Sequence, residues 1–247
     1  MNINKQLANL YLSKWDELCK ALNDNGLFGY EYNPLLLNIN DEDDFESADV
    51  RVMLIGQDMS YGDWYKYDRN ADILAECMPS CKTFDNEKGS IKNIDGPRHH
   101  SGMGGGMNQF IDMLNNRYNG KKIRYVWNDL IKIGRNTKYN AKQETLKEIE
   151  YKNFDVLRDE VQIIQPQVIV FMTGPTSYWE SILQKRFGIK KDNYKELAQW
   201  NNIRQVAKID IGDNEYPFIK YVYRTYHPCA RIKKYPIYKA IIDDIIL

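Results

Sequence analysis

Four short apolar runs, rich in β-branched residues, place the strongest constraint on how this chain can fold. They occupy residues 50–55, 123–127, 168–172 and 218–224. Such runs are typical of strands that are buried on both faces of a parallel sheet. Apolar residues at helical spacing predict helices over residues 5–22, 108–117, 143–164, 176–187 and 237–246. Strands that alternate with helices predict an α/β fold with helices on both faces of the sheet.

Length and composition fit one folded domain. The chain has 247 residues, of which 43% are hydrophobic and 28% charged, and these values exclude a fully disordered chain. No apolar run approaches the roughly 18 residues of a membrane helix, and the N-terminus lacks the pattern of a secretory signal. We therefore expect a cytoplasmic, monomeric protein with no membrane partner. Its single domain covers residues 1–247, with an N-terminal helical extension (1–49) and irregular insertions at 62–106 and 188–216.

Charge and cysteine content limit the partners and cofactors. Lys plus Arg and Asp plus Glu are both 34, so the formal net charge is zero. This balance disfavours a general polyanion-coating protein but allows a local basic face. Cys77 and Cys81 form a C-x3-C pair, and no second pair completes a four-ligand metal site. We expect reduced thiols, no metal and no cofactor.

Polar residues follow each predicted strand directly. They are, in chain order, Gly56–Asp58, Asn128–Asp129, Thr173–Gly174 and Thr225–Pro228. In parallel α/β sheets, ligands bind beyond the carboxyl ends of the strands. Asp58, Asn128 and His227 are therefore expected to meet at one rim, as a trio suited to acid–base work and to reading the edge of a base. Taken singly, an Asp or Asn after a strand is more often a helix cap or a turn residue.

These motifs, taken together, resemble those of the uracil-DNA glycosylase superfamily. Gly56-Gln57-Asp58, followed by Tyr61-Gly62, resembles the first motif of that family. The segment 127–132 looks like the strand that ends in the family's base-reading asparagine, and 225–228 looks like its His-Pro motif. Residues 157–174 are similar to the intervening segment of the iron–sulfur-containing branch. The resemblance spans residues 50–235 and implies a three-layer α/β/α fold with a short, mainly parallel four-stranded sheet.

The resemblance also implies a catalytic pair. Asp58 would orient the attacking water and stabilise positive charge on the sugar. His227 would donate a hydrogen bond to the base carbonyl that gains negative charge as the glycosidic bond breaks. A fixed carboxylate and a fixed hydrogen-bond donor suit these two developing charges.

Four further residues are expected to hold the base. By resemblance, Asn128 would read the Watson–Crick edge of the flipped base, and the backbone N–H of Gln57 would help to hold it. An amide can donate and accept at once, and so can match O4 and N3–H of uracil together. Ser60 and Tyr61 stand where the best-known branch has tyrosine and histidine, so we expect them to alter base specificity.

Two basic stretches border these motifs and are expected to contact DNA. Residues 220–239 include Arg224 and five other cations, with interleaved tyrosines and no acid, and residues 131–142 also lack acids. Cations over a phosphate backbone supply sequence-independent affinity, and aromatic side chains can stack on bases. The predicted DNA-binding residues, with Ile232 as a wedge into the duplex, are Arg135, Lys138, Arg231, Ile232, Lys233 and Lys234.

The sequence therefore predicts a monofunctional DNA glycosylase of base excision repair. It would act on uracil, or on a related damaged or modified base, flipped from single- or double-stranded DNA. One alternative is a non-catalytic nucleic-acid-binding member of the same fold. Another is a hydrolase of free nucleosides or nucleotides, against which the basic stretches argue.

Overall fold

The computed structural model describes residues 2–27, 31–58, 84–85, 90–91, 102–135, 143–212 and 215–247. The chain is divided into two compact units. The first contains the described residues of 1–42, Asp58 and the described residues of 128–163. The second contains residues 43–57, the described residues of 83–127, and those of 164–247. Within the described ranges, no helix has the length and apolar character needed to cross a membrane.

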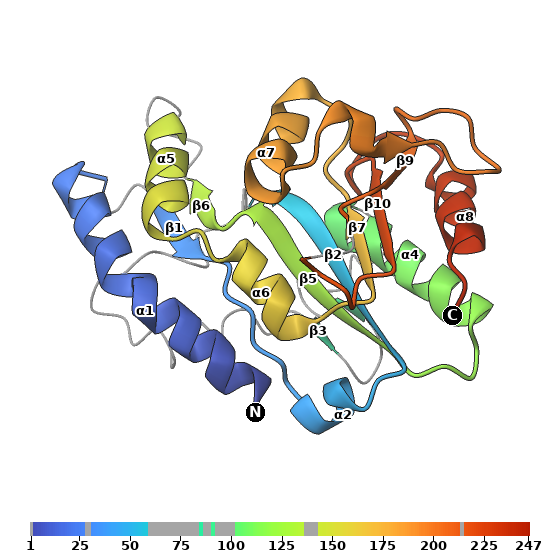
Figure 1. Ribbon diagram of the computed structural model, residues 1–247, viewed down its shortest axis with the longest axis horizontal. Helices are drawn as coiled ribbons and strands as arrows, with labels where there is room; N and C mark the ends of the chain where they lie inside the picture. The colour runs from blue at the N-terminus through green and yellow to red at the C-terminus, as the bar shows by residue number, and fades with distance from the viewer. Residues whose placement is uncertain are drawn as a thin grey trace. The chain divides into compact units, whose positions relative to one another are not determined.

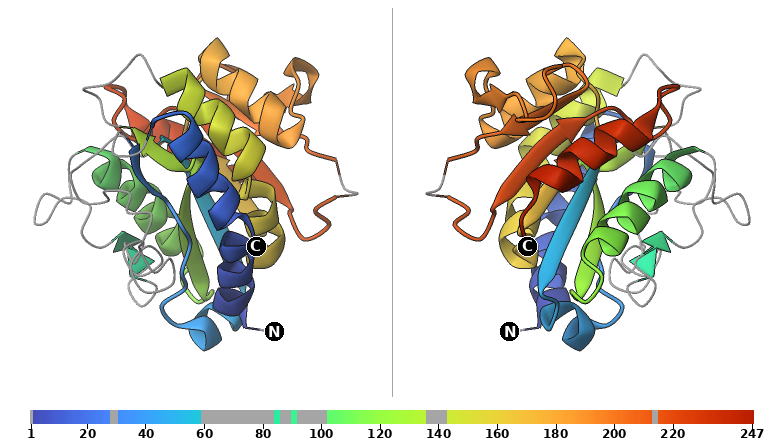
Figure 2. Two further views of the ribbon diagram at one scale, coloured as in Figure 1. Left: turned by 90° about the vertical axis from the view of Figure 1, so that its left-hand side faces the viewer. Right: turned by 90° about the vertical axis from the view of Figure 1, so that its right-hand side faces the viewer.

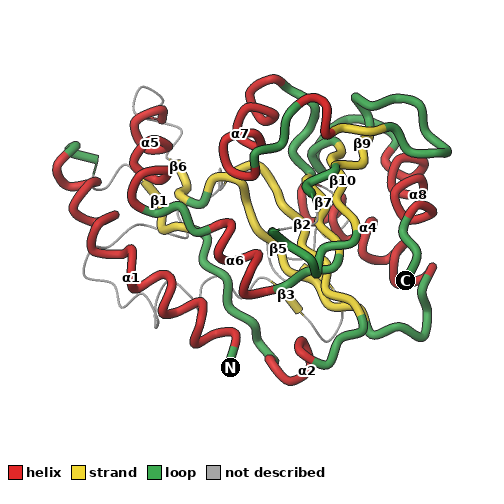
Figure 3. The backbone as a smooth tube through the Cα atoms, viewed as in Figure 1, coloured by secondary structure: helices red, strands yellow, loops and turns green. Residues whose placement is uncertain are grey.

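A six-stranded mixed sheet, in the order β5-β2-β7-β10-β9-β8, organises the fold (Figure 1). Its strands are β2 (Val50–Asp58), β5 (Ile123–Ile131), β7 (Val168–Phe171), β8 (Tyr194–Lys195), β9 (Val206–Ile209) and β10 (Tyr221–Thr225). β7 pairs in parallel with β2 on one side and with β10 on the other. These three strands run side by side in the backbone trace (Figure 3). The α/β class predicted from the sequence is confirmed.

The expected four-stranded sheet is corrected to six strands. All four predicted strands are present, but the segment 188–216, predicted to be irregular, adds β8, β9 and the short helix η3 (Lys191–Asn193). β9 pairs antiparallel with both β8 and β10. Arg224 on β10 secures this addition, because its guanidinium donates to the backbone carbonyls of Ile203 and Arg204 at 2.8 and 2.9 Å.

Helices of the second unit cover both faces of its strands. α4 (Gly102–Arg117) and α8 (Lys234–Asp244) lie side by side on one face (Figure 2). Phe110 of α4 and Tyr238 of α8 form an edge-to-face contact, with their ring centroids 5.5 Å apart. α7 (Ser177–Phe187) lies toward the opposite face, beginning after the capping side chain of Thr176. The short helix α2 (Glu42–Glu46) precedes β2, and β3 (Phe84–Asp85) pairs with β4 (Ser90–Ile91).

The first unit contains α1 (Ile3–Asp24), α5 (Gln143–Asn153), α6 (Leu157–Ile164) and the antiparallel pair β1 (Glu31–Pro34) and β6 (Ile133–Arg135). Phe154 lies against α1. Its ring is stacked on that of Tyr11, with centroids 6.3 Å apart, and is edge-on to that of Trp15, with centroids 6.1 Å apart. The single helix predicted over 143–164 is wrong. Phe154 and Val156 are both fully buried, whereas residues two apart on a helix point about 200° apart, so the chain leaves the helix there.

Candidate functional site

The carboxyl ends of β2, β7 and β10 lie at one edge of the sheet. Phe171 is in register with Ile55 on β2 and with Arg224 on β10, so the three strands run level with one another. Beyond the ladder, the N–H of Gly174 still donates to the carbonyl of Thr225 at 2.8 Å. Gly174 has a φ of 81°, which favours glycine at this turn. The polar residues that directly follow these strands are thus positioned by the paired backbone of the sheet.

Gln57 and Asp58 end β2, and both are half-buried. The Gln57 side chain donates through Nε2 to the backbone carbonyl of Thr173 at 2.7 Å. Because Thr173 follows β7, this bond holds the Gln57 amide at the carboxyl end of the neighbouring strand. Ser60 and Tyr61, the predicted specificity residues, lie outside the described residues.

His227 follows β10 and is half-buried. Its Nδ1 accepts a hydrogen bond from the backbone N–H of Cys229 at 3.2 Å. An Nδ1 that accepts leaves the ring proton on Nε2 in the neutral imidazole, so Nε2–H is a donor. The pKa of His227 lies below its ordinary value because burial disfavours the imidazolium, and the ammonium of Lys234 disfavours it further. His227 is therefore a neutral donor near pH 7.

We expect His227 to titrate below the ordinary histidine pKa of 6.5. The unfolded chain then binds the proton first as pH falls. The contribution of His227 to stability is therefore complete above pH 6.5 and is lost as pH falls from there through the lowered pKa of the folded state. Nitrogen-15 NMR, assigned with His227→Gln, should show the Nε2–H tautomer near pH 7. A titration midpoint at or above 6.5 would refute this account of the imidazole.

Asn128 is fully buried, in a polar cluster of the first unit. Its Nδ2 donates to Glu160 Oε2 at 2.8 Å. Its Oδ1 accepts from Lys132 Nζ at 2.5 Å and from the backbone N–H of Asp129 at 2.9 Å. The amide that was predicted to read the base therefore forms hydrogen bonds within the protein. Asn128 belongs to the first unit, whereas Gln57 and His227 belong to the second.

The same cluster is charge-paired and reaches α1. Lys132 and Glu160 are both 0% exposed and form a salt bridge of 2.8 Å. Tyr11 donates its hydroxyl hydrogen to Glu160 Oε1 at 2.6 Å, and that hydroxyl accepts from the backbone N–H of Leu37 at 2.9 Å. Buried charges are tolerated when they are paired and hydrogen-bonded. We name Tyr11, Asn128, Lys132 and Glu160 the Lys132–Glu160 network.

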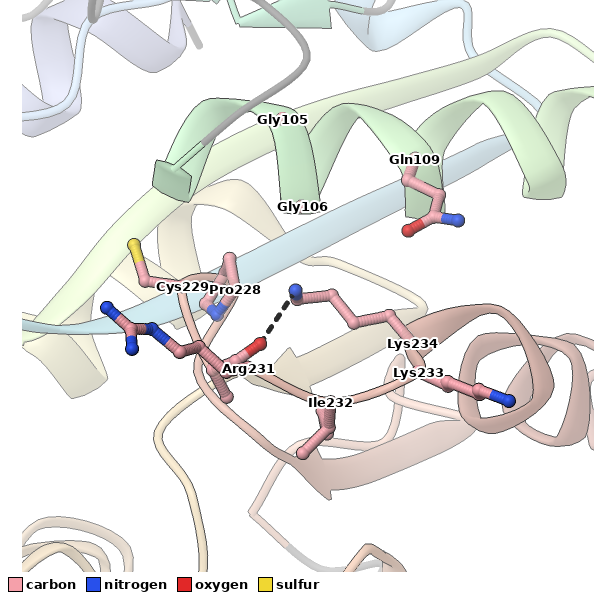
Figure 4. A pocket seen from close by; sticks show the side chains of 10 residues that line it. Gly105, Gly106, Gln109, Pro228, Cys229, Arg231, Ile232, Lys233 and Lys234 are labelled. Carbon is pink, nitrogen blue, oxygen red and sulfur yellow. Dashed lines mark hydrogen bonds between the residues drawn. The ribbon is translucent and has the colours of Figure 1, made fainter.

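A cavity of about 520 Å³ lies next to His227 in sequence, between α4 and the loop that joins β10 to α8 (Figure 4). Gly105, Gly106 and Gln109 line it from α4, and residues 228–234 line it from the loop and α8. Among the described residues, the lining includes the cations Arg231, Lys233 and Lys234 and no carboxylate. Lys234 reaches back to the carbonyl of Ala230 at 2.9 Å, whereas Lys233 projects away. The cavity therefore suits an anion.

Gly106 permits the close approach of α4 to the loop. A Cβ built at this position would lie 2.7 Å from both the Cβ and the carbonyl oxygen of Pro228. We expect Gly106→Ala to lower the free energy of unfolding by about 1–3 kcal/mol through overpacking, measured by urea denaturation. Gln109→Ala, on the same helix, should change it by less than about 0.5 kcal/mol. Stabilisation by Gly106→Ala would mean that α4 and Pro228 are not in tight contact.

The predicted DNA-binding residues have different settings. Arg231 and Lys233 are exposed, Ile232 is 36% exposed and Lys234 is half-buried. Two others lie on the basic segment 131–142: Arg135 ends β6, and Lys138 lies outside the described residues.

Arg224 does not belong to a basic surface. Its side chain is 2% exposed, and one of its guanidinium nitrogens lies 3.5 Å from Glu180. Burial lowers the pKa of this guanidinium from its ordinary value. Lys239, another cation of the same stretch, pairs with Asp243. Sequence composition overestimated the basic face because it does not separate strand residues from loop residues.

Gln109 and the glycine wall of the cavity were not among the residues expected from the sequence, whereas Tyr235 belongs to the tyrosines expected to stack on bases. The glycines lie in a stretch predicted to be irregular, although they form the first turns of α4. Tyr235 is 58% exposed in the first turn of α8, beside Lys234. A glycine run directly before an amphipathic helix was the available signal for a close approach.

Comparisons with known proteins do not add to these observations. No protein-family model matches the chain. A search of curated proteins likewise gives no match.

Proposed function

We propose that the protein is a monofunctional DNA glycosylase. It hydrolyses the N-glycosidic bond of uracil, or of a related damaged or modified base, flipped out of DNA. The proposal depends most on His227, a neutral imidazole that follows a central strand with Nδ1 occupied and Nε2–H available to donate. Its sequence support is the ordered set of motifs that resembles the uracil-DNA glycosylase superfamily.

The chemistry matches the residue types. Breaking the bond leaves an oxocarbenium-like sugar and an anionic base, so a donor aimed at the base carbonyl favours the transition state over the ground state. Nε2–H of His227 is assigned this role, and a neutral donor gives up no proton to the base. Asp58, the last residue of β2, is assigned to orient the attacking water and to stabilise the sugar cation.

The loop after His227 supports DNA as the substrate. Its cations line the cavity beside α4 and would attract a phosphate backbone. Ile232 and Tyr235 are exposed next to these cations, and apolar or aromatic side chains can wedge between bases or stack on them. Flipping a base out of DNA requires contacts that hold the phosphate backbone and a side chain that fills the gap left between the neighbouring bases.

We expect Arg231→Gln/Lys233→Gln to weaken DNA binding and to flatten its salt dependence. Each phosphate contact that is lost lowers the slope of log K against log salt by about 1, so the double variant should lose up to about 2. Fluorescence anisotropy with single- and double-stranded oligonucleotides, over a series of salt concentrations, measures the slope. Lys195→Gln, which removes an exposed cation on β8, is the matched control. An unchanged slope in the double variant would remove the loop from the DNA interface.

The proposed activity is tested by excision from a panel of oligonucleotides. Each carries one uracil, hypoxanthine, xanthine or 5-substituted uracil, and alkaline cleavage reports the abasic sites. Release of at least one base supports the proposal. Salt-sensitive DNA binding without excision across the panel would instead establish the second candidate, a non-catalytic nucleic-acid-binding protein of the same fold. The burial of the Asn128 amide is the observation that favours this second candidate.

A further inference from the structure

The amide of Asn128 has little capacity left to read a base. A side-chain amide offers two N–H donors and two acceptor lone pairs. Lys132 and the backbone N–H of Asp129 occupy the Asn128 oxygen, and Glu160 takes one N–H. A bidentate contact with a base needs one donor and one acceptor on the same amide. Base reading by Asn128 would require breaking bonds inside the Lys132–Glu160 network.

A second amide has these capacities available. Within the part of the chain that the structure describes, the Gln57 side chain makes one hydrogen bond, from Nε2 to the carbonyl of Thr173 at 2.7 Å. Its Oε1 and its second N–H can therefore form a donor–acceptor pair. Because a carbonyl can only accept, this bond also fixes which end of the Gln57 amide is the nitrogen.

The surroundings of Gln57 point to a polar ligand. Thr173 is 0% exposed, and its Oγ1 has no hydrogen-bond partner among the described residues. Buried polar atoms are generally satisfied, so one without a partner calls for a ligand or a water. β7 lies between β2 and β10, which places Thr173 at the strand end between those that lead to Gln57 and His227. These three residues belong to the second unit.

We propose that the side chain of Gln57, rather than that of Asn128, reads the edge of the base, and that Thr173 positions it. This inference rests on the proposed function. A fixed N–H beside a fixed oxygen matches a base that presents C=O next to N–H, as uracil, hypoxanthine and xanthine do. Cytosine and adenine present the reverse pattern. To match them the amide must flip, which would set Gln57 Oε1 against the Thr173 carbonyl oxygen. The site therefore selects oxo bases over amino bases.

Gln57→Glu tests the reading role because it exchanges the donor for an acceptor. A carboxylate accepts from the amino group of cytosine and repels O4 of uracil. We expect the ratio of uracil affinity to cytosine affinity to fall about 10–100-fold, the discrimination of a good bidentate contact. Isothermal titration of the free bases into the full chain measures that ratio without requiring catalysis. Gln57→Leu should lower the affinity for uracil about as much as Gln57→Glu does, without raising the affinity for cytosine. Urea denaturation checks that both variants fold.

The outcomes separate this inference from the proposed function. Excision by the wild type, with an unchanged uracil-to-cytosine ratio in Gln57→Glu, overturns the reading role of Gln57 and leaves the glycosylase proposal intact. A shifted ratio in a protein that excises nothing supports Gln57 and rejects the glycosylase. Wild-type protein that binds neither base overturns the inference directly.

Discussion

Glu160→Gln is expected to lower the free energy of unfolding by about 3–5 kcal/mol, the cost of leaving a buried charge without its partner. Lys132, whose side chain is 0% exposed, would lose its carboxylate partner. The glutamine would also keep only one of the two carboxylate oxygens that now accept from Tyr11, Asn128 and Lys132. Urea denaturation measures the change.

A double-mutant cycle separates the ion pair from general core damage. Once Lys132→Met has removed the ammonium, Glu160→Gln should cost clearly less than it does in the wild type, because no unpaired cation remains. Lys239→Gln breaks the exposed pair with Asp243 and should change stability by less than about 1 kcal/mol. Equal costs of Glu160→Gln in both backgrounds would show that the two charges are not coupled.

His227→Ala is expected to reduce the single-turnover rate of base release by about 100–1000-fold, the effect of removing one donor aimed at developing negative charge. The affinity for DNA should change little, because the donor acts mainly in the transition state. His227→Gln keeps an N–H donor and should retain more activity than His227→Ala. Quenched-flow excision with enzyme in excess measures the rates.

A control variant distinguishes loss of the His227 donor from a general loss of activity. Lys195→Gln changes a residue on β8, at the end of the strand order, to which no role in the site is assigned, and should keep the wild-type rate. A His227→Ala protein that folds normally and excises at the wild-type rate would remove the imidazole from the reaction.

The sequence predicted the central strands well because their signal is local. Val168–Phe171 is an unbroken apolar run and is fully buried in the structure. β8 has only two residues, Tyr194 and Lys195, and no run of that length stands out from a polar segment. Its position depends on β9, which Arg224 secures against β10 from about 20 residues away in the chain.

The candidate site was predictable in part for the same reason. Gln57 and His227 follow recognisable strands, and the rule that ligands lie beyond strand ends places both at one edge. The burial of Asn128 was not predictable, since it depends on Glu160, 32 residues further along the chain. Likewise, the need for glycine at position 106 arises from Pro228, and nothing in the local sequence identifies that neighbour.

The proposed reaction breaks the bond between a base and its sugar in DNA. Mass spectrometry of a uracil-containing oligonucleotide, incubated with excess wild-type protein and in parallel with Asp58→Asn, tests it most directly. We expect free uracil and an intact abasic strand from the wild type, and little of either from Asp58→Asn. An unchanged oligonucleotide mass with the wild type, or equal base release by the two proteins, would contradict it.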